Sequence, residues 1–428
     1  MSRVKGGALP TIRRLMNAIS DATPLPLPAR CDVLVIGAGP AGSACAQKLA
    51  AGGLDVVLVD QHDFPRDKVC GDGLIPDSHA ALRRLGVYDE VAALAQRVQH
   101  VRCVGPRGGF VDVPGSLSVL PRKVLDHVLV RAAGRAGARL VTPVRFESPL
   151  LDGEQVVGAR VKAGGAVRDV TARWVVLATG ALPQALTAAG LCDRHTPSGV
   201  ALRGYVKNDA LVPHIRQLQI VWHPRLRGGY GWIFPAPGGL FNIGAGLTGS
   251  HIRQGNGKGR MQDVNLRGMF DAFCEVYTPA RELMATGALQ GDLKGAPLRC
   301  SMVGSRWSRP GLLATGEAVG STYAFSGEGI GKAMETGILA AEAILQGRHD
   351  TDATVRRGYE ASLAALKPRF DMYETASNVN NHPWIADLVV WRARKSPRIL
   401  RRMSGMLEET QNPGRLFSWR GLTRLMFE

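Results

Sequence analysis

The sequence predicts an α/β protein with a discontinuous Rossmann-like domain, an inserted antiparallel β-sheet domain and a helical C-terminal region. Three observations predict this fold class. A glycine-rich motif follows a short apolar run that begins near residue 31, and a second strand, glycine-rich turn and helix occur over 311–345. The stretch between them, 199–249, is rich in strand patterns. Residues after 355 are mostly helical in pattern.

The first glycine motif has the context that a dinucleotide site requires. The apolar run Asp32–Ile36 predicts a buried strand, and Ala41–Ala51 predicts the helix after it. The turn between them has the spacing GxGxxG, at Gly37, Gly39 and Gly42. The first glycine permits a tight turn, the second lets a pyrophosphate approach the backbone, and the third lets the helix pack on the strand. The helix N-terminus at Ala41 then faces the phosphates.

A second apolar run, Asp55–Asp60, ends in an acid. Asp60 lies 18 residues after Gly42, where a carboxylate accepts hydrogen bonds from ribose hydroxyls. The strand, the helix and this acid together predict a dinucleotide-binding site rather than an incidental glycine-rich turn.

Composition limits the classes of partner. The seven cysteines are scattered without CxxC spacing, which favours a cytoplasmic setting and argues against structural zinc, so no metal site is predicted. The net charge of +17 favours anionic partners, or reflects an arginine-rich proteome. Aromatic residues are not interleaved with basic ones, so no nucleic-acid surface is expected. No apolar run has the length of a membrane-spanning helix.

The 428 residues suffice for two or three domains, with a ligand cleft expected between them. Asp77–Leu94 predicts a helix, and the unbroken apolar run Trp174–Gly180 predicts a buried strand that returns to the first sheet. The predicted segments are a tail (1–30), the Rossmann-like domain in parts (31–100, 101–190 with small strands, and 285–346), a substrate-binding sheet (191–284) and a helical region (347–428).

With the stretch Phe64–Leu74, which contains PRDKVCGDGL, the chain resembles the geranylgeranyl reductase family. That family consists of FAD enzymes with the p-hydroxybenzoate hydroxylase fold, and the resemblance covers most of residues 31–410. It implies FAD as the cofactor and places Cys70 near the flavin ring and the substrate. Arg66 and Lys68 would offer positive charge to phosphate or to reduced flavin, and Gly71 would let the backbone approach the cofactor.

A second motif, Tyr230–Pro235, resembles the YxWxFP signature of these reductases. The resemblance implies that its aromatic residues line an isoprenoid cavity. Halogenases of the same superfamily carry tryptophan where Tyr230 stands and isoleucine where Phe234 stands, so both residues favour the reductases. The predicted substrate-binding residues are Tyr230, Trp232, Phe234 and Pro235.

The third motif resembles the second flavin signature of the family. Gly316 and Glu317 stand where a glycine and an aspartate usually contact the cofactor. Gly327, Gly329 and Ile330 form the turn that opens a helix toward the flavin ring. Arg122 resembles an arginine that contacts the FAD phosphates, with a surface arginine as the open alternative.

The resemblance implies hydride transfer from reduced FAD to a carbon–carbon double bond of an isoprenoid, with Cys70 and Tyr230 as catalytic candidates. Two readings compete with it: an FAD-dependent monooxygenase or halogenase acting on an aromatic or carrier-bound substrate, and a non-catalytic flavoprotein. The electron donor stays open between NAD(P)H and a ferredoxin-like protein. The basic amphipathic stretch 398–407 predicts either peripheral contact with the inner face of an acidic membrane or a packed cap.

Overall fold

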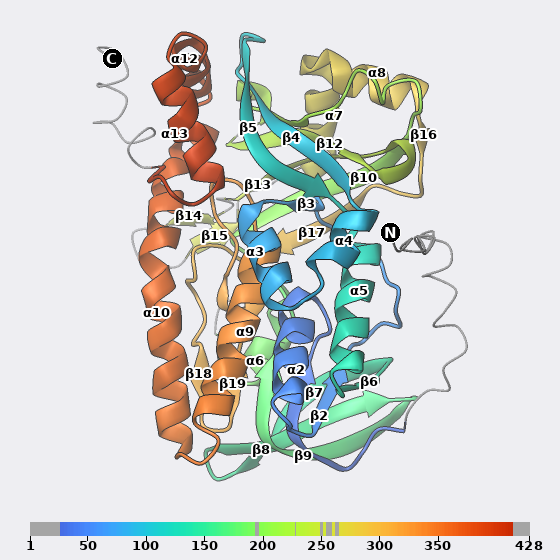
Figure 1. Ribbon diagram of the computed structural model, residues 1–428, viewed down its shortest axis with the longest axis vertical. Coiled ribbons are helices and arrows are strands. Elements are labelled where there is room, and N and C mark those ends of the chain that lie inside the picture. The colour runs from blue at the N-terminus through green and yellow to red at the C-terminus, as the bar shows by residue number, and fades with distance from the viewer. Residues whose placement is uncertain are drawn as a thin grey trace, which may run out of the picture.

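The structure is a computed structural model that describes residues 26–192, 197–226, 228–248, 251–253, 259–261 and 265–413. It confirms the predicted α/β class, with two main sheets stacked along the long axis of the molecule (Figure 1). The long helix α10 (Asp352–Ala376) runs along one side. Residues 1–25, which make up most of the predicted tail, lie outside the described residues.

The first sheet forms from the predicted apolar runs, in the strand order β18-β19-β9-β1-β2-β6. β1 (Arg30–Ile36) is parallel to β2 (Val56–Val59) and to β9 (Ala166–Leu177). All four residues of β2 are buried, as expected for a parallel strand covered on both faces. The run predicted at 174–180 does return to this sheet, at the end of β9. The other strands are β6 (Arg139–Val141), β7 (Val144–Asp152), β8 (Gln155–Ala163), β18 (Ser308–Arg309) and β19 (Leu312–Ala314).

Helices α2 (Pro40–Ala51) and α9 (Ile330–Gln346) meet at their backbones. A Cβ atom on Gly337 of α9 would lie 2.2 Å from the carbonyl oxygen of Ala41. α5 (Arg122–Arg135) also packs against α2. This close packing brings the first and third motifs together, although they are far apart in the sequence.

The single helix predicted over 77–94 is wrong, because the structure has two. α3 (Pro76–Arg84) and α4 (Tyr88–Leu94) are separated by Gly86, whose φ of 67° lies in the left-handed region that commonly ends helices. Of the apolar residues expected on one face of that helix, Leu82, Leu85 and Val91 are buried in one core and Leu94 packs against it, whereas Ala80 is exposed.

The second sheet has the order β16-β10-β13-β12-β11-β4-β5-β3 and contains the predicted antiparallel strands of the substrate domain. β4 (Gln96–Val104) and β5 (Phe110–Val119) also belong to it, although the sequence predicts the segments 31–100 and 101–190 as parts of the Rossmann-like domain. β4 pairs with β11, a strand more than 100 residues later in the chain, and β5 pairs with β4, so both lie in the second sheet. The other strands are β3 (Gly73–Leu74), β10 (Gly199–Lys207), β11 (Leu218–Val221), β12 (Gly229–Ala236), β13 (Leu240–Leu247), β16 (Ala288–Leu289) and β17 (Lys294–Leu298), with β14 (His251–Arg253) and β15 (Gly259–Met261) as a separate pair.

Helices cover both faces of the second sheet. α7 (Leu266–Val276) and α8 (Thr278–Thr286) pack on the face that buries Ile233. α12 (Trp384–Ala393) and α13 (Pro397–Leu407) pack with the opposite face, which presents Trp232. The short helices are α6 (Gln184–Ala188), α11 (Asn378–Asn381), η1 (Pro224–Leu226), η2 (Pro237–Gly239) and η3 (Gly316–Val319).

The apolar face of α13 is packed against the protein. Ile399, Met403 and Met406 are buried in the cluster that contains Trp232. The alternative of a packed cap therefore describes this helix, and its apolar face is not available to a membrane. Among the described residues, no helix combines the length and the apolar character that crossing a membrane requires.

Candidate active site

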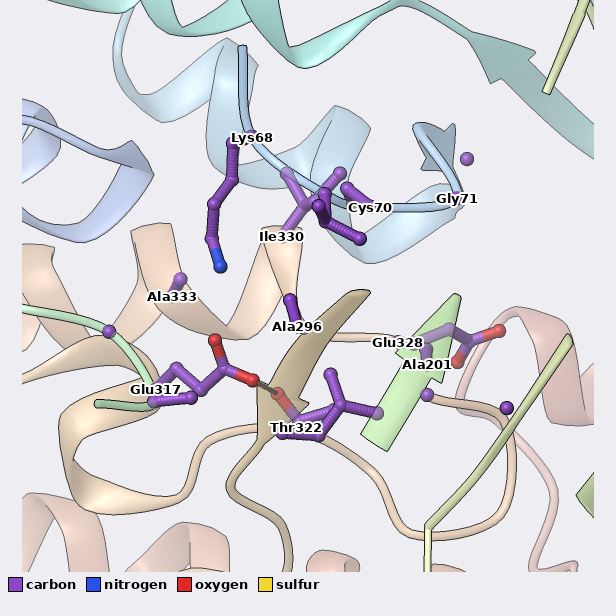
Figure 2. A pocket seen from close by; sticks show the side chains of 18 of the residues that line it. Lys68, Cys70, Gly71, Ala201, Ala296, Glu317, Thr322, Glu328, Ile330 and Ala333 are labelled. Atoms are coloured by element: carbon purple, nitrogen blue, oxygen red, sulfur yellow. Dashed lines mark hydrogen bonds between the residues drawn. The ribbon is translucent and has the colours of Figure 1, made fainter. Parts of the chain in front are cut away.

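A cavity of about 850 Å³ lies between the two sheets (Figure 2). One part is lined by loops that follow strands of the first sheet, including Gly37 after β1, Asp60 after β2 and Thr179 after β9. Parallel α/β sheets bind ligands at this edge, outside the carboxyl ends of their strands. The other part of the lining comes from the second sheet and from helices α12 and α13.

The three glycines of the first motif differ in what surrounds them. A Cβ atom would lie 2.3 Å from the carbonyl oxygen of Ala178 at Gly37, and 1.8 Å from that of Gly37 at Gly42. Both positions therefore exclude a side chain for reasons internal to the protein. At Gly39 a Cβ atom would meet only guanidinium nitrogens, at 3.6 and 3.8 Å. Gly39 thus faces open space, which suits the approach of a ligand.

Those guanidinium groups belong to Arg66 and Arg122. The fully buried carboxylate of Asp126 pairs with both, at 3.1 Å from Arg66 Nη1 and 2.6 Å from Arg122 Nε. Arg66 also lies 3.3 Å from Asp60, and its Nε has no hydrogen-bond partner among the described residues. The cluster holds two cations beside Gly39, where an anionic pyrophosphate would lie.

Residues of the third motif face the same cavity. The Glu317 carboxylate accepts hydrogen bonds from the Arg299 backbone N–H at 3.3 Å and from the Thr322 hydroxyl at 3.4 Å. Figure 2 shows this second contact, and it shows Lys68 extending into the cavity from the facing loop. Lys68 forms no ion pair with any residue that the structure describes, so its charge remains available to a ligand.

These features fit FAD. The Asp60 carboxylate accepts hydrogen bonds from the backbone N–H groups of Ala38 and His62, at 2.9 and 3.1 Å. These bonds fix the carboxylate beside the first motif, where a ribose would lie. The Arg66 Nε without a partner and the open face of Gly39 suit the pyrophosphate. Gly327, Gly329 and Ile330 line the cavity where α9 begins, so the N-terminus of this helix faces the cavity.

The stretch that carries Cys70 is fixed by buried polar groups of the second sheet. Asn242 donates to the Cys70 carbonyl at 2.7 Å and to Asp72 at 2.8 Å, and it accepts from Trp232 Nε1 at 2.9 Å. Arg203 donates to the Lys68 carbonyl at 2.8 Å. Burial raises the pKa of Asp72 to about 6, against the donors that hold it. Long-range contacts thus set the position of this stretch.

Replacing Asn242 with alanine is expected to reduce the free energy of unfolding by about 2–4 kcal/mol, because Asp72 and Trp232 would lose buried partners. Denaturant unfolding of the two proteins measures the difference. Gln290→Ala, at an exposed side chain, is the matched control. A loss no larger than that of the control would contradict the structural role of Asn242.

Both predicted catalytic residues face the cavity and are protonated. Burial raises the pKa of the Cys70 thiol and of the Tyr230 phenol. The Tyr230 hydroxyl donates to the Ser326 carbonyl at 2.5 Å. Neither group is activated as an anion, and the hydroxyl proton of Tyr230 is already engaged.

Most of the predicted site residues come together around the cavity, and three do not line it. Tyr230, Trp232 and Phe234 face it, whereas Pro235 points to the other side of β12, because side chains alternate along a strand. Gly42 and Gly316 lie behind the wall, and a Cβ atom on Gly316 would be 2.6 Å from that of Ala41. The predicted residues on the wall are Gly37, Gly39, Ala41, Asp60, Arg66, Lys68, Cys70, Gly71, Arg122, Glu317, Gly327, Gly329, Ile330, Tyr230, Trp232 and Phe234.

Sequence reasoning missed Asp126, Arg203 and Glu328. Asp126 follows Arg122 by one helical turn, and that spacing is a usable signal for an ion pair. Arg203 carries no local signal, because its partners lie more than 130 residues away. Glu328 stands inside the third motif, between Gly327 and Gly329, which are both predicted to contact the cofactor.

Comparisons with known proteins agree with this geometry. A model of the FAD binding domain matches residues 30–223. The menaquinone reductase of Mycolicibacterium smegmatis is 33% identical over 343 residues, which cover 74% of this chain and 77% of the relative. Digeranylgeranylglycerophospholipid reductase 1 of Methanopyrus kandleri is 29% identical over 77% of this chain and 84% of its own length. The chain belongs to the family of FAD-dependent oxidoreductases that contains these reductases.

Solved structures confirm the fold of this family member. A geranylgeranyl bacteriochlorophyll reductase-like protein of Thermoplasma acidophilum has a TM-score of 0.68 at 21% identity, covering 93% of this chain and 96% of its own. A flavin-dependent brominase has a TM-score of 0.70 at 20% identity, covering 93% and 98%. The fold is therefore shared by reductases and halogenases, and it does not by itself identify the reaction.

Proposed function

We propose that this FAD-dependent oxidoreductase reduces carbon–carbon double bonds in the isoprenoid chain of a lipid. The observation that carries the proposal is the continuity of the cavity from the flavin-binding loops into an apolar, aromatic part. That part is walled by β12 and by α12 and α13, and it suits a long hydrocarbon. Its lining includes Val101, Val113, Leu218, Ile220, Trp222, Phe325, Ala386, Val389, Val390, Met403, Met406 and Leu407.

Bound FAD would supply the hydride. The chain's own residues bind and orient both partners. Arg66 and Arg122 would hold the phosphates. Gly71 lies against Phe234, where a Cβ atom would be 3.1 Å from the ring, so the absence of a side chain leaves room there. Trp232 and Phe234 exclude water and keep an alkene close to the flavin. Proximity and a dry site matter here because an isolated alkene is not polarised by a carbonyl.

The relatives support the substrate class, since menaquinone and digeranylgeranylglycerophospholipid both carry isoprenoid chains. The electron donor is proposed to be NAD(P)H or a ferredoxin-like protein that docks transiently. Of the two GxGxxG spacings in the sequence, the one at Gly37–Gly42 joins a strand to a helix, whereas the one that starts at Gly244 begins inside strand β13 and does not form a second nucleotide unit.

Anaerobic incubation with a chemical reductant tests the proposal. The protein is offered menaquinone and digeranylgeranylglycerophospholipid in parallel, and the lipids are examined by mass spectrometry. The quinone ring is first reoxidised in air, so that a quinol does not contribute to the mass, and a gain of two hydrogens per reduced carbon–carbon double bond is then expected in at least one lipid. No gain in either lipid, together with oxygen-dependent hydroxylation or halogenation of an aromatic or carrier-bound compound, would favour the monooxygenase or halogenase alternative.

Contact with an acidic membrane is proposed for the outer face of α12. Its inner face lines the cavity at Ala386 and Val389. Trp384 and Trp391 are 49% and 47% exposed, and seven residues apart they lie on one side of the helix. Lys395 Nζ lies 4.9 Å from the centre of the Trp391 ring. Tryptophan beside basic residues suits the interface of an anionic bilayer.

Replacing Trp384 and Trp391 with alanine is therefore expected to weaken binding to anionic vesicles by about tenfold, because two interfacial side chains are lost. Cosedimentation with phosphatidylglycerol vesicles measures the binding. The control is the pair Leu151→Ser and Val167→Ser, at side chains 52% and 60% exposed in β7 and β9. Those strands lie at the other end of the molecule from α12 (Figure 1). Equal binding by both double variants would refute membrane contact through α12.

A further inference from the structure

Glu328 lies at the junction of the two parts of the cavity. It occupies the turn between Gly327 and Gly329 that opens α9, and it lines the cavity. The neighbouring Gly327 touches the apolar part, since a Cβ atom there would be 2.6 Å from the Tyr230 hydroxyl. Figure 2 shows Glu317 and Glu328 at separate places along the wall. One carboxyl thus lies on the side of the nucleotide loops, and the other lies near the aromatic residues.

No described residue forms an ion pair with Glu328. The nearby cation, Lys332 on α9, forms ion pairs with other carboxylates. Its Nζ lies 2.7 Å from Glu335, 2.9 Å from Glu409 and 3.7 Å from Asp77. Glu328 is therefore a half-buried residue of the cavity wall with more negative than positive groups around it.

These surroundings keep a proton on Glu328 at neutral pH. Burial is the largest cause, and the charges of Asp77 on α3 and Glu409 after α13 add to it, raising the pKa of Glu328 to about 8. A hydrogen bond with Ser326 and the charge of Lys332 oppose the shift and are outweighed. Tyr230 on β12 and Tyr373 on α10 also face it, and Glu328 contributes to the raised pKa of each phenol.

We propose that Glu328 is the proton donor for the reduction, an inference that rests on the function proposed above. Hydride from the reduced cofactor brings two electrons and forms one C–H bond. The O–H bond of Glu328 breaks, and its proton forms the second C–H bond at the other alkene carbon, which uses the former π electrons. The cofactor is oxidised, the alkene is reduced by two hydrogens, and Glu328 is left as a carboxylate that regains a proton from solvent.

Glu328 suits this role better than the two residues that the sequence suggested. A general acid works best when its pKa is close to the working pH. Cys70 and Tyr230 hold their protons more tightly than their ordinary values imply, because burial raises both pKa values. The Tyr230 hydroxyl also donates its proton in a hydrogen bond to the Ser326 carbonyl. The carboxyl of Glu328 combines a transferable proton with a place in the cavity wall.

The variant Glu328→Gln keeps the shape of the side chain and removes the acid. With FAD bound, its single-turnover rate toward digeranylgeranylglycerophospholipid is expected to fall by about 100-fold. The control is Glu342→Gln, at a 39%-exposed side chain on α9, the helix that follows Glu328. In the unaltered protein the rate should fall as the pH rises through about 8. A rate for Glu328→Gln equal to that of the control would overturn the inference.

A second readout does not depend on turnover. Infrared difference spectra across a pH titration of the FAD-loaded protein should show a protonated carboxyl that is lost near pH 8 and is absent from Glu328→Gln. Asp77→Asn, which removes a neighbouring negative charge, should move that transition to lower pH. No such carboxyl band would also overturn the inference. Failure of the proposed function is distinguishable, because the unaltered protein would then reduce no lipid.

Discussion

Replacing Gly39 with valine is expected to weaken FAD binding by about 100-fold or more while leaving the fold intact. The backbone at this position, φ −73°, is accessible to any residue, and a Cβ atom would meet only the ends of two flexible arginine side chains. The branched side chain would instead fill the space that a pyrophosphate needs in order to reach the backbone N–H groups. Fluorescence titration of apoprotein with FAD measures the loss.

The matched control is Gly134→Ala in α5, where nothing lies within 4 Å of the added carbon. It should bind FAD as the unaltered protein does and be slightly more stable, since alanine favours helices over glycine. Thermal unfolding of the Gly39 variant without FAD should match that of the unaltered apoprotein. Normal FAD affinity in Gly39→Val would mean that the pyrophosphate lies elsewhere.

Replacing Ala386 with tryptophan is expected to lower kcat/KM for a long isoprenoid lipid by about tenfold or more, with FAD binding retained. Ala386 is buried on α12 and lines the apolar part of the cavity. An indole there would occupy volume that the lipid chain needs. Steady-state assays with isoprenoids of two chain lengths measure the effect, and the longer chain should lose more.

Ala393→Trp separates cavity filling from general overpacking. Ala393 is buried in the same helix and the same core cluster, but it does not line the cavity. Both substitutions should lower stability by about 1–3 kcal/mol, whereas the dependence on chain length should occur at Ala386 alone. Equal kcat/KM values for the two variants would place the lipid chain outside this part of the cavity.

The nucleotide half of the site could be predicted from the sequence because its signals are local. The glycines, the flanking strand and helix, and Asp60 all lie within 30 residues of one another. Tyr230, Trp232 and Phe234 were also predictable as a set, since alternate residues of a strand share a face. The same alternation places Pro235 on the other face, and it could have been used to exclude that residue.

The rest depends on contacts that no local pattern contains. Asn242 on β13 donates hydrogen bonds to Cys70 and Asp72, about 170 residues earlier in the chain. Arg203 on β10 donates to the Lys68 carbonyl. The amphipathic pattern of 398–407 correctly predicts an apolar face, but the pattern alone does not identify the surface that covers it. The properties of Glu328 likewise come from burial and from Asp77 and Glu409, which only the fold brings near.

A single anaerobic turnover tests the central claim most directly, namely that the cavity brings an isoprenoid alkene to the flavin. Reduced, FAD-loaded protein is mixed with menaquinone or with digeranylgeranylglycerophospholipid in the absence of oxygen. The absorbance of oxidised FAD is followed, and the mass of the lipid is measured by mass spectrometry. The expected result is one FAD reoxidised for each pair of hydrogens added to carbon–carbon double bonds of the lipid, counted after any quinol ring has been reoxidised in air. FAD that stays reduced with either lipid, and is reoxidised only when oxygen is admitted, would contradict the claim.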